Sequence, residues 1–166
     1  MLEFTDEYVN ALRENVRYEN GELLWNVTRG LAKANQPCGA NYVDKQGYRE
    51  MSFLGIKATL HRFVWIYHRG PYAGDIDHID GDPSNCRIEN LRKCTRSENL
   101  KNRGKFKNCS SKYKGVYFRK DTKKWQASIR LNGKTKHLGV YDTELAAHLA
   151  WLSAATEHHG EFLRRE

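Results

Sequence analysis

The N-terminal half of the chain shows short stretches of regularly spaced apolar side chains. In residues 60–70, LHRFVWIYHRG, the apolar positions recur at helical spacing, and a Gly-Pro pair follows at the end. A second helix is expected from about Asp6 to Val16. Strand-like runs at 22–27 and 48–55 lie between loops that contain Gly, Asn and Pro. The pattern predicts short helices and short strands in this half.

The last third of the chain has a different pattern. Strand-like runs occupy 114–120, 124–131 and 133–141, and the middle run alternates apolar with polar side chains. The turns between the runs are expected at Asp121–Lys123 and Asn132–Gly133, because Asn-Gly is a strong hairpin signal. The final run, 143–160, is an Ala- and Leu-rich helix that we expect to be capped by Asp142 or Thr143 and ended by Gly160. The pattern predicts a three-stranded antiparallel sheet with one helix packed on one face, which leaves the other, polar and basic face of the sheet free.

Composition narrows the functional class. The formal net charge is +8 and the basic residues are dense between Arg87 and Lys136, which favours nucleic acid as the partner. No apolar run approaches the roughly 20 residues of a membrane span, and the first residues lack an apolar signal core. We therefore expect a soluble cytoplasmic protein without a membrane partner.

The segment 76–102, IDHIDGDPSNCRIENLRKCTRSENLKN, concentrates the candidate chemistry. Its pattern predicts a strand, a turn, a second strand and then a helix that starts at Thr95 with Glu98 as a capping box. Four aspartates precede the basic region, as expected where a metal ion must meet a phosphate. Adjacent strand residues point to opposite faces, so the sequence leaves open whether Asp77 and His78 share one face.

Hydrolysis of a phosphodiester requires a base for water and a positive charge near the phosphate. His78 is a candidate base because the ordinary pKa of histidine lies near 6.5. Asp77 and Asn99 carry the oxygen donors that a hard cation such as Mg²⁺ prefers.

These residues resemble the HNH endonucleases of phage and intron homing type. The similarity covers about 60–103 and includes DHIDGD, the following Asn-Leu and the final Glu-Asn. The resemblance implies that His78 is the general base, that Asn90 holds the loop and orients it, and that Asp77 and Asn99 bind one divalent ion. We expect Mg²⁺, with Mn²⁺ as the alternative.

Other residues of the region carry weaker predictions. Asp80 and Asp82 are expected to form the turn, and His61 is expected to be structural. The four cysteines, which lack a C-x-x-C pair, are expected to be free thiols without a structural zinc. The polar and basic stretch 104–112 is interpreted as a linker, which either follows a phosphate backbone or is only a solvated connector.

The C-terminal run resembles the Apetala (ethylene-response-factor) DNA-binding domain over about 113–160, through YKGVYFR, KWQASIR and KHLGVYDTELAAHLAW. In that family the sheet enters the major groove, and the resemblance implies a DNA-binding face. Trp125 and Trp151 are expected in the core. The residues of the expected face are Lys114, Tyr117, Arg119, Gln126, Ser128, Arg130, Thr135 and His137.

The sequence thus predicts an α+β protein with a ββα-metal (HNH) nuclease domain at 1–103, its core at 71–103, followed by the linker and the docking domain at 113–166. The predicted function is a homing-type endonuclease that nicks one strand of double-stranded DNA. We expect a monomer, with a dimer as the alternative. Two rival interpretations stay open: a non-catalytic DNA-binding regulator with a degenerate nuclease motif, and a structural or RNA-binding protein that uses only the basic stretch.

Overall fold

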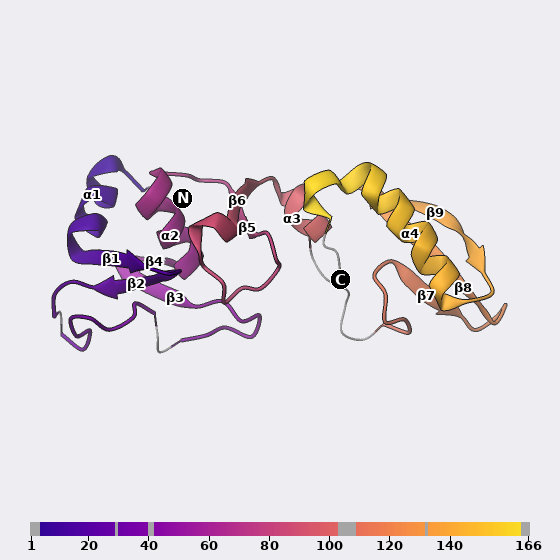
Figure 1. Cartoon of the computed structure of the whole chain (residues 1–166), viewed down its shortest axis with the longest axis horizontal. Helices are drawn as coiled ribbons and strands as arrows, with labels where there is room; N and C mark the ends of the chain where they lie inside the picture. Colours follow the sequence, from indigo (N-terminus) through magenta and orange to yellow (C-terminus); the bar gives the residue numbers. More distant parts are fainter. Residues whose placement is uncertain (1–3, 29, 40–41, 103–108, 132, 164–166) are drawn as a thin grey trace. The chain divides into compact units, whose positions relative to one another are not determined.

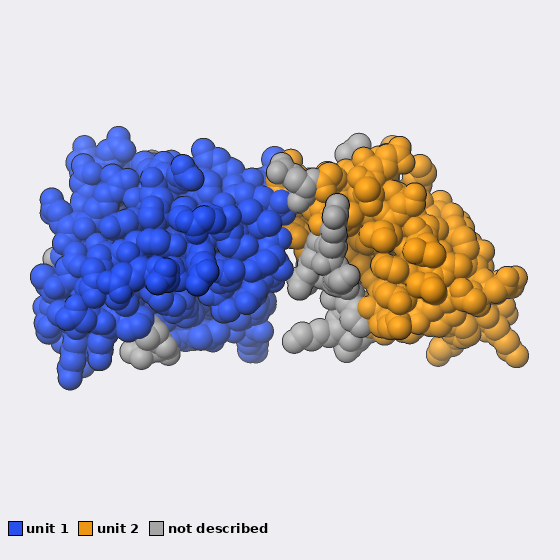
Figure 2. Space-filling view, in the orientation of Figure 1, with its two compact units in different colours: residues 1–95 blue, residues 96–166 orange. Residues whose placement is uncertain are grey.

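The computed structural model describes residues 4–28, 30–39, 42–102, 109–131 and 133–163. The chain divides into two compact units, Met1–Thr95 and Arg96–Glu166 (Figures 1 and 2). The sequence places the domain boundary at 104–112, whereas the contacts divide the chain before α3. Residues 103–108 of the expected linker and Asn132 of the expected turn lie outside the described residues.

The first unit consists of short helices and three two-stranded antiparallel sheets. Two of its strands, β1 and β4, are not expected from the sequence, because each is a four-residue run without clear alternation. The elements are α1 (Asp6–Asn15), β1 (Val16–Glu19), β2 (Glu22–Trp25), β3 (Glu50–Phe53), β4 (Ile56–Thr59), α2 (Leu60–Arg69), β5 (Asp75–His78), η1 (Ile88–Asn90) and β6 (Leu91–Cys94).

The core of the first unit forms around α2, whose apolar positions are buried on several sides. Leu60, Phe63 and Ile66 are fully buried in it, together with Leu12 of α1 and Leu23 of β2. In Figure 1 this helix lies beside both N-terminal hairpins and close to β5. The position of β5 is therefore set by a helix that the rest of the unit surrounds.

The second unit contains a three-stranded antiparallel sheet in the order β7-β8-β9, with α4 packed along it (Figure 1). Thr143 caps α4 by accepting a hydrogen bond from the Ala146 N–H at 3.1 Å, and Gly160 ends the helix. The elements are α3 (Arg96–Asn102), β7 (Val116–Arg119), β8 (Lys124–Leu131), β9 (Lys134–Tyr141), α4 (Glu144–His159) and η2 (Gly160–Phe162).

A second hydrophobic core lies between this sheet and α4. Val116, Ala127 and Ile129 of the sheet are buried against Ala147 and Trp151 of the helix. Trp125 packs at the border of the same core, so both tryptophans have the packing role expected from the sequence. Among the described helices, none is long and apolar enough to cross a membrane.

Gly115, directly before β7, lies against the Trp151 ring of α4. Its φ of +72° is rare for other residues, and an added Cβ would lie 2.2 Å from the Trp151 ring and 2.7 Å from the Ser128 carbonyl oxygen. Gly133 has a similar φ of +78° with no atom within 4 Å of an added Cβ.

We predict that Gly115→Ala lowers the free energy of unfolding of the second unit by about 2 kcal/mol or more, since backbone strain adds to overpacking. The matched variant Gly133→Ala carries the strain alone and should lose about 1 kcal/mol. Urea unfolding followed by tryptophan fluorescence measures both losses. Equal losses would contradict the close packing at Gly115.

Candidate active site

Asp77 and His78 are the last two residues of β5, and their positions are set by pairing with β6. The register places Asp77 opposite Arg92 and His78 opposite Leu91. Both sides of β5 are covered at this point, because Asp77 is 7% exposed and His78 only 3%. The two side chains that the sequence nominates are therefore adjacent and buried.

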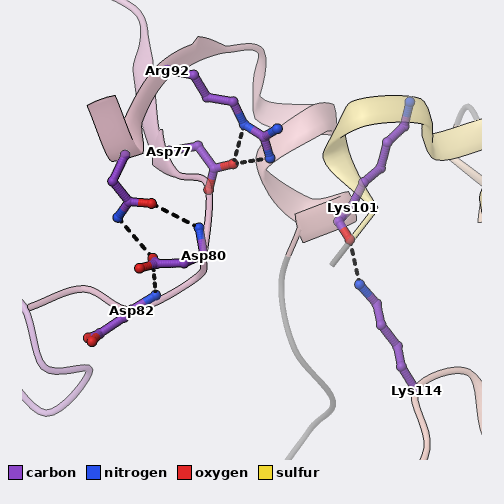
Figure 3. Close-up of polar contacts among 7 residues, drawn as sticks. Asp77, Asp80, Asp82, Arg92, Lys101 and Lys114 are labelled. Atoms are coloured by element: carbon purple, nitrogen blue, oxygen red, sulfur yellow. Dashed lines mark hydrogen bonds and ion pairs between the residues drawn. The ribbon is translucent and has the colours of Figure 1, made fainter. Parts of the chain in front are cut away.

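Asp77 forms an ion pair with Arg92 across the two strands (Figure 3). Arg92 Nε and Nη2 both donate to Asp77 Oδ2, at 3.0 and 2.8 Å. The two side chains are only 8% and 13% exposed. A carboxylate buried to this degree needs such a partner, because an unpaired charge away from water is strongly destabilising.

The His78 ring lies in a cluster of aromatic rings and one thiol. It packs edge-on against His61 with ring centroids 4.7 Å apart, and against Tyr48 at 5.8 Å. Cys86 Sγ is 4.0 Å from His78 Nε2. His61 Nε2 also lies 3.3 Å from the Thr59 hydroxyl oxygen. His61, which the sequence analysis assigns a structural role, is thus a direct neighbour of the candidate base.

Burial keeps both histidines neutral. It lowers the pKa of His78 below 6.5, although the nearby carboxylates of Asp80, Asp77 and Asp82 oppose the shift. Burial lowers the pKa of His61 to about 3, and the proximity of His78 and Arg62 adds to the effect. A neutral imidazole at position 78 has a nitrogen that can accept a proton, as a general base requires.

Asn90 holds the loop that follows His78. Its side-chain oxygen accepts from the Asp80 N–H at 3.1 Å, and its Nδ2 donates to Asp80 Oδ1 at 2.9 Å and to the Asn85 carbonyl at 2.8 Å. Its backbone carbonyl accepts from the Ile79 N–H at 2.8 Å. Asn90 therefore fixes the two residues directly after His78, which is the geometry that the predicted orienting role requires.

Asp80 and Asp82 act within the turn, as the sequence analysis expects. Asp80 Oδ1 accepts from the Asp82 N–H at 2.8 Å, and Asp82 Oδ1 accepts from the Ser84 N–H at 2.9 Å (Asp80 and Asp82 in Figure 3). Burial alone would raise the pKa of Asp80, but hydrogen bonds from the Asp82 N–H, Asn90 and Asn85 outweigh it and lower that pKa. The carboxylate form thus stabilises the loop.

Asn99, the second expected metal ligand, is in α3 and belongs to the second unit. Within the described ranges, no cluster of three or more His, Cys, Asp or Glu side chains could hold a metal ion. The donor chemistry of Asp77 and Asn99, a carboxylate and an amide oxygen, fits a hard cation. A cation on Asp77 must share that carboxylate with Arg92 or displace the guanidinium.

The expected DNA-binding residues mostly lie on the face of the sheet opposite α4. Cross-strand register pairs Tyr117 with Gln126, Ser128 with His137, and Arg130 with Thr135, so these six side chains share one face.

Two of the expected residues of that face are engaged elsewhere in the chain. Arg119, on the same face, forms an ion pair with Asp121. Lys114 precedes β7, and its Nζ donates to the Lys101 carbonyl at 2.6 Å.

Comparison with known proteins identifies the class to which this centre belongs. Residues 58–101 match the family described as HNH endonuclease. The chain is 34% identical to Protein 3.8 of Escherichia phage T7 over 107 residues, which cover 63% of this chain and 87% of that protein. The chain therefore belongs to the HNH endonuclease family, a family of nucleases that act on DNA.

A second viral relative supports this assignment. The chain is 37% identical over 125 residues to an uncharacterized HNH endonuclease of Acanthamoeba polyphaga mimivirus, which is 73% of this chain and 63% of that protein. The chain thus spans less than two thirds of the mimivirus protein. No solved structure matches the chain.

Three neighbours of the candidate base are not identified as site residues from the sequence: Tyr48, His61 and Cys86. They come from separate segments, so only the fold brings them together. The sequence does contain a signal for the pairing of Arg92 with Asp77, because it predicts the two strands that form the hairpin. Once the register of that hairpin is known, residue 92 lies opposite residue 77.

We predict that Asn90→Ala frees the Asp80 amide. Loss of the side-chain acceptor should speed hydrogen exchange at Asp80 by about tenfold, since an orphaned hydrogen bond costs about 1–3 kcal/mol. Exchange at Ile79, whose partner is the backbone carbonyl of residue 90, should change less. Exchange measured by NMR tests this, with Asn10→Ala on α1 as control. Unchanged exchange at Asp80 would contradict the role of Asn90.

We predict that stability falls as the pH drops below 6.5, partly through His61. The pKa of His61 is about 3 in the folded chain and 6.5 in the unfolded chain. Between pH 6.5 and pH 3 the unfolded chain therefore binds more protons than the folded chain, so the free energy of unfolding decreases as the pH falls. One such site contributes up to about 1.4 kcal/mol per pH unit. Urea unfolding at several pH values should give a shallower slope for His61→Gln than for the wild type. Identical slopes would show that His61 titrates normally.

Proposed function

We propose that the chain is a metal-dependent, homing-type endonuclease that nicks one strand of double-stranded DNA. His78 is the general base, Asn90 positions it, and Asp77 and Asn99 hold one divalent ion, with Mg²⁺ as the preferred species. The observation that carries the proposal is the buried His78 next to a buried carboxylate, at the end of a strand whose following loop is held by Asn90.

The roles of the chain's own residues follow from these contacts. His78 accepts the proton of the attacking water, because its burial keeps the imidazole neutral. Asn90 holds the backbone directly after His78 and so limits the movement of the ring. When bound, the divalent ion would offset the negative charge that develops on the phosphate and on the leaving 3′ oxygen.

The burial of His78 sets a condition on this mechanism. At 3% exposure the ring does not meet solvent, so the atoms that cover it must move when a phosphate approaches. The same burial, together with the Asp77–Arg92 pair, favours the rival function of a DNA-binding protein whose nuclease motif is inactive. Plasmid nicking separates the two functions.

The polar face of the β7-β8-β9 sheet is proposed to dock on the duplex, as the resemblance to the Apetala domain implies. Arg130, Thr135 and His137 are exposed there, on a face that register makes continuous across the three strands. Cations on such a face bind phosphates by releasing counterions, so affinity should fall with added salt. We propose that a single copy of the chain binds and nicks, with a dimer as the alternative.

We predict that the wild-type chain nicks supercoiled plasmid in the presence of Mg²⁺ and that EDTA abolishes nicking. His78→Ala should reduce the rate by a factor of about 10²–10⁴, the usual contribution of a general base. His158→Ala, in which the lost ring lies 3.9 Å from the exposed carboxylate of Glu157, is the control and should nick normally. Wild-type rates in His78→Ala would remove His78 from the mechanism. Absence of nicking by the wild type would favour the inactive-motif function.

We predict that Arg130→Ala weakens binding to duplex DNA and lowers the slope of log affinity against log salt by about 1, the loss of one phosphate contact. Arg17→Ala in the first unit, where the guanidinium pairs with Glu19, should change neither quantity. Fluorescence anisotropy with a labelled duplex at several salt concentrations measures both. Unchanged affinity and slope in Arg130→Ala would exclude this face as the docking surface.

A further inference from the structure

The second unit contains a cavity that the nuclease centre does not require and that shares part of its lining with the proposed docking face. Its volume is about 810 Å³, within the range of roughly 300–1,000 Å³ that is usual for small-molecule sites. Its walls come from α3, from residues 113–117, from the adjoining ends of β8 and β9, and from α4. It opens onto the polar face of the sheet, because five residues assigned to that face also line it: Lys114, Tyr117, Ser128, Arg130 and Thr135.

The charge of the lining selects an anion. Of the described residues that line the cavity, none is acidic and four are cationic: Arg96, Lys101, Lys114 and Arg130. The Lys114 ammonium group donates to the carbonyl of Lys101 in α3, as Figure 3 shows, and lies 5.7 Å from the centre of the Trp151 ring. Cations from α3, β8 and the segment before β7 therefore converge on one space.

Aromatic rings form part of the same wall. Tyr113, Tyr117 and Trp151 line the cavity. Trp151 is buried and Tyr113 stacks on His148 with ring centroids 3.9 Å apart, so Tyr117, which is 41% exposed, offers the most open ring. Aromatic side chains of this kind bind flat rings through their faces. An anionic group joined to a flat ring is the chemistry of a nucleotide.

His159 is an independent sign that the cavity receives a ligand. It lines the cavity at 6% exposure, and neither of its ring nitrogens has a hydrogen-bond partner within the described part of the chain. A buried polar group without a partner is unfavourable, so such groups in native proteins call for an explanation. Burial lowers the pKa of His159 to about 4, with Lys114 and Lys101 adding to the shift, so the ring offers one N–H donor and one acceptor.

We propose that this cavity binds a nucleotide, with the phosphate at the lysine and arginine side chains, the base against the aromatic wall, and a polar group of the ligand bonded to His159. The site goes beyond nicking and beyond docking of a paired duplex. In a DNA strand the nucleotide must be unpaired, because a base has to leave the stack to enter a pocket.

Calorimetry of the full-length chain in EDTA tests the proposal without cleavage. The probes are free deoxyadenosine monophosphate, a short single-stranded oligonucleotide and the matching blunt duplex. Leu100→Trp narrows the cavity and should weaken binding of the nucleotide or single strand by about tenfold or more. Leu145→Trp is the matched control, because Leu145 is 55% exposed against 52% for Leu100 and lies outside the lining. It should bind as the wild type does.

A second variant separates ligand binding from folding. His159→Leu removes the unpartnered nitrogens, so the thermal midpoint should hold or rise while nucleotide binding weakens by about tenfold. Tighter binding of the oligonucleotide than of the free nucleotide would identify a DNA strand as the source, and the reverse would identify a free nucleotide. The proposal is overturned if the wild type binds neither the free nucleotide nor the single strand, if it binds only the duplex, or if Leu100→Trp and His159→Leu both bind as the wild type does. Because no metal or cleavage is involved, failure of the nuclease proposal leaves this result unaffected.

Discussion

The pairing of β5 with β6 is the constraint on which the candidate centre depends. Four antiparallel residue pairs set Asp77 opposite Arg92 and His78 opposite Leu91, so one register decides both the charge compensation and the position of the base. A shift by one residue would turn every one of these side chains to the other face. Asn90 directly precedes β6, and its side chain is hydrogen-bonded to Asp80 at the start of the loop between the strands. The register of β5 and β6 therefore also determines the conformation of this loop.

Burial has two opposing consequences at this centre. It keeps His78 and His61 neutral, which suits a proton acceptor, and it requires Arg92 as a partner for Asp77. It also covers the ring that, in our proposal, must reach the water that attacks the phosphate. The chain belongs to a family of endonucleases, and for the proposed mechanism substrate binding must expose His78. In our proposal the basic sheet face of the second unit supplies the affinity for duplex DNA, and the cationic cavity that adjoins this face binds a nucleotide.

Much of the fold could be predicted from the sequence because helical spacing and strand alternation are local signals. The helices at 60–69 and 144–159 follow from such signals. The strands β1 and β4 were missed, because four-residue strands gain their stability from pairing and packing. The ring cluster of Tyr48, His61 and His78 could not be predicted, because it depends on tertiary packing between distant segments.

In the proposed mechanism, His78 and Asp77 face a DNA phosphodiester and direct its hydrolysis at the 3′ oxygen. Sequencing the ends that the chain produces from a library of duplex DNA with Mg²⁺ tests this claim most directly. We expect breaks in one strand with a 5′ phosphate and a 3′ hydroxyl, concentrated at a defined sequence. Ends of a different chemistry, or no breaks above the background of untreated DNA, would contradict it.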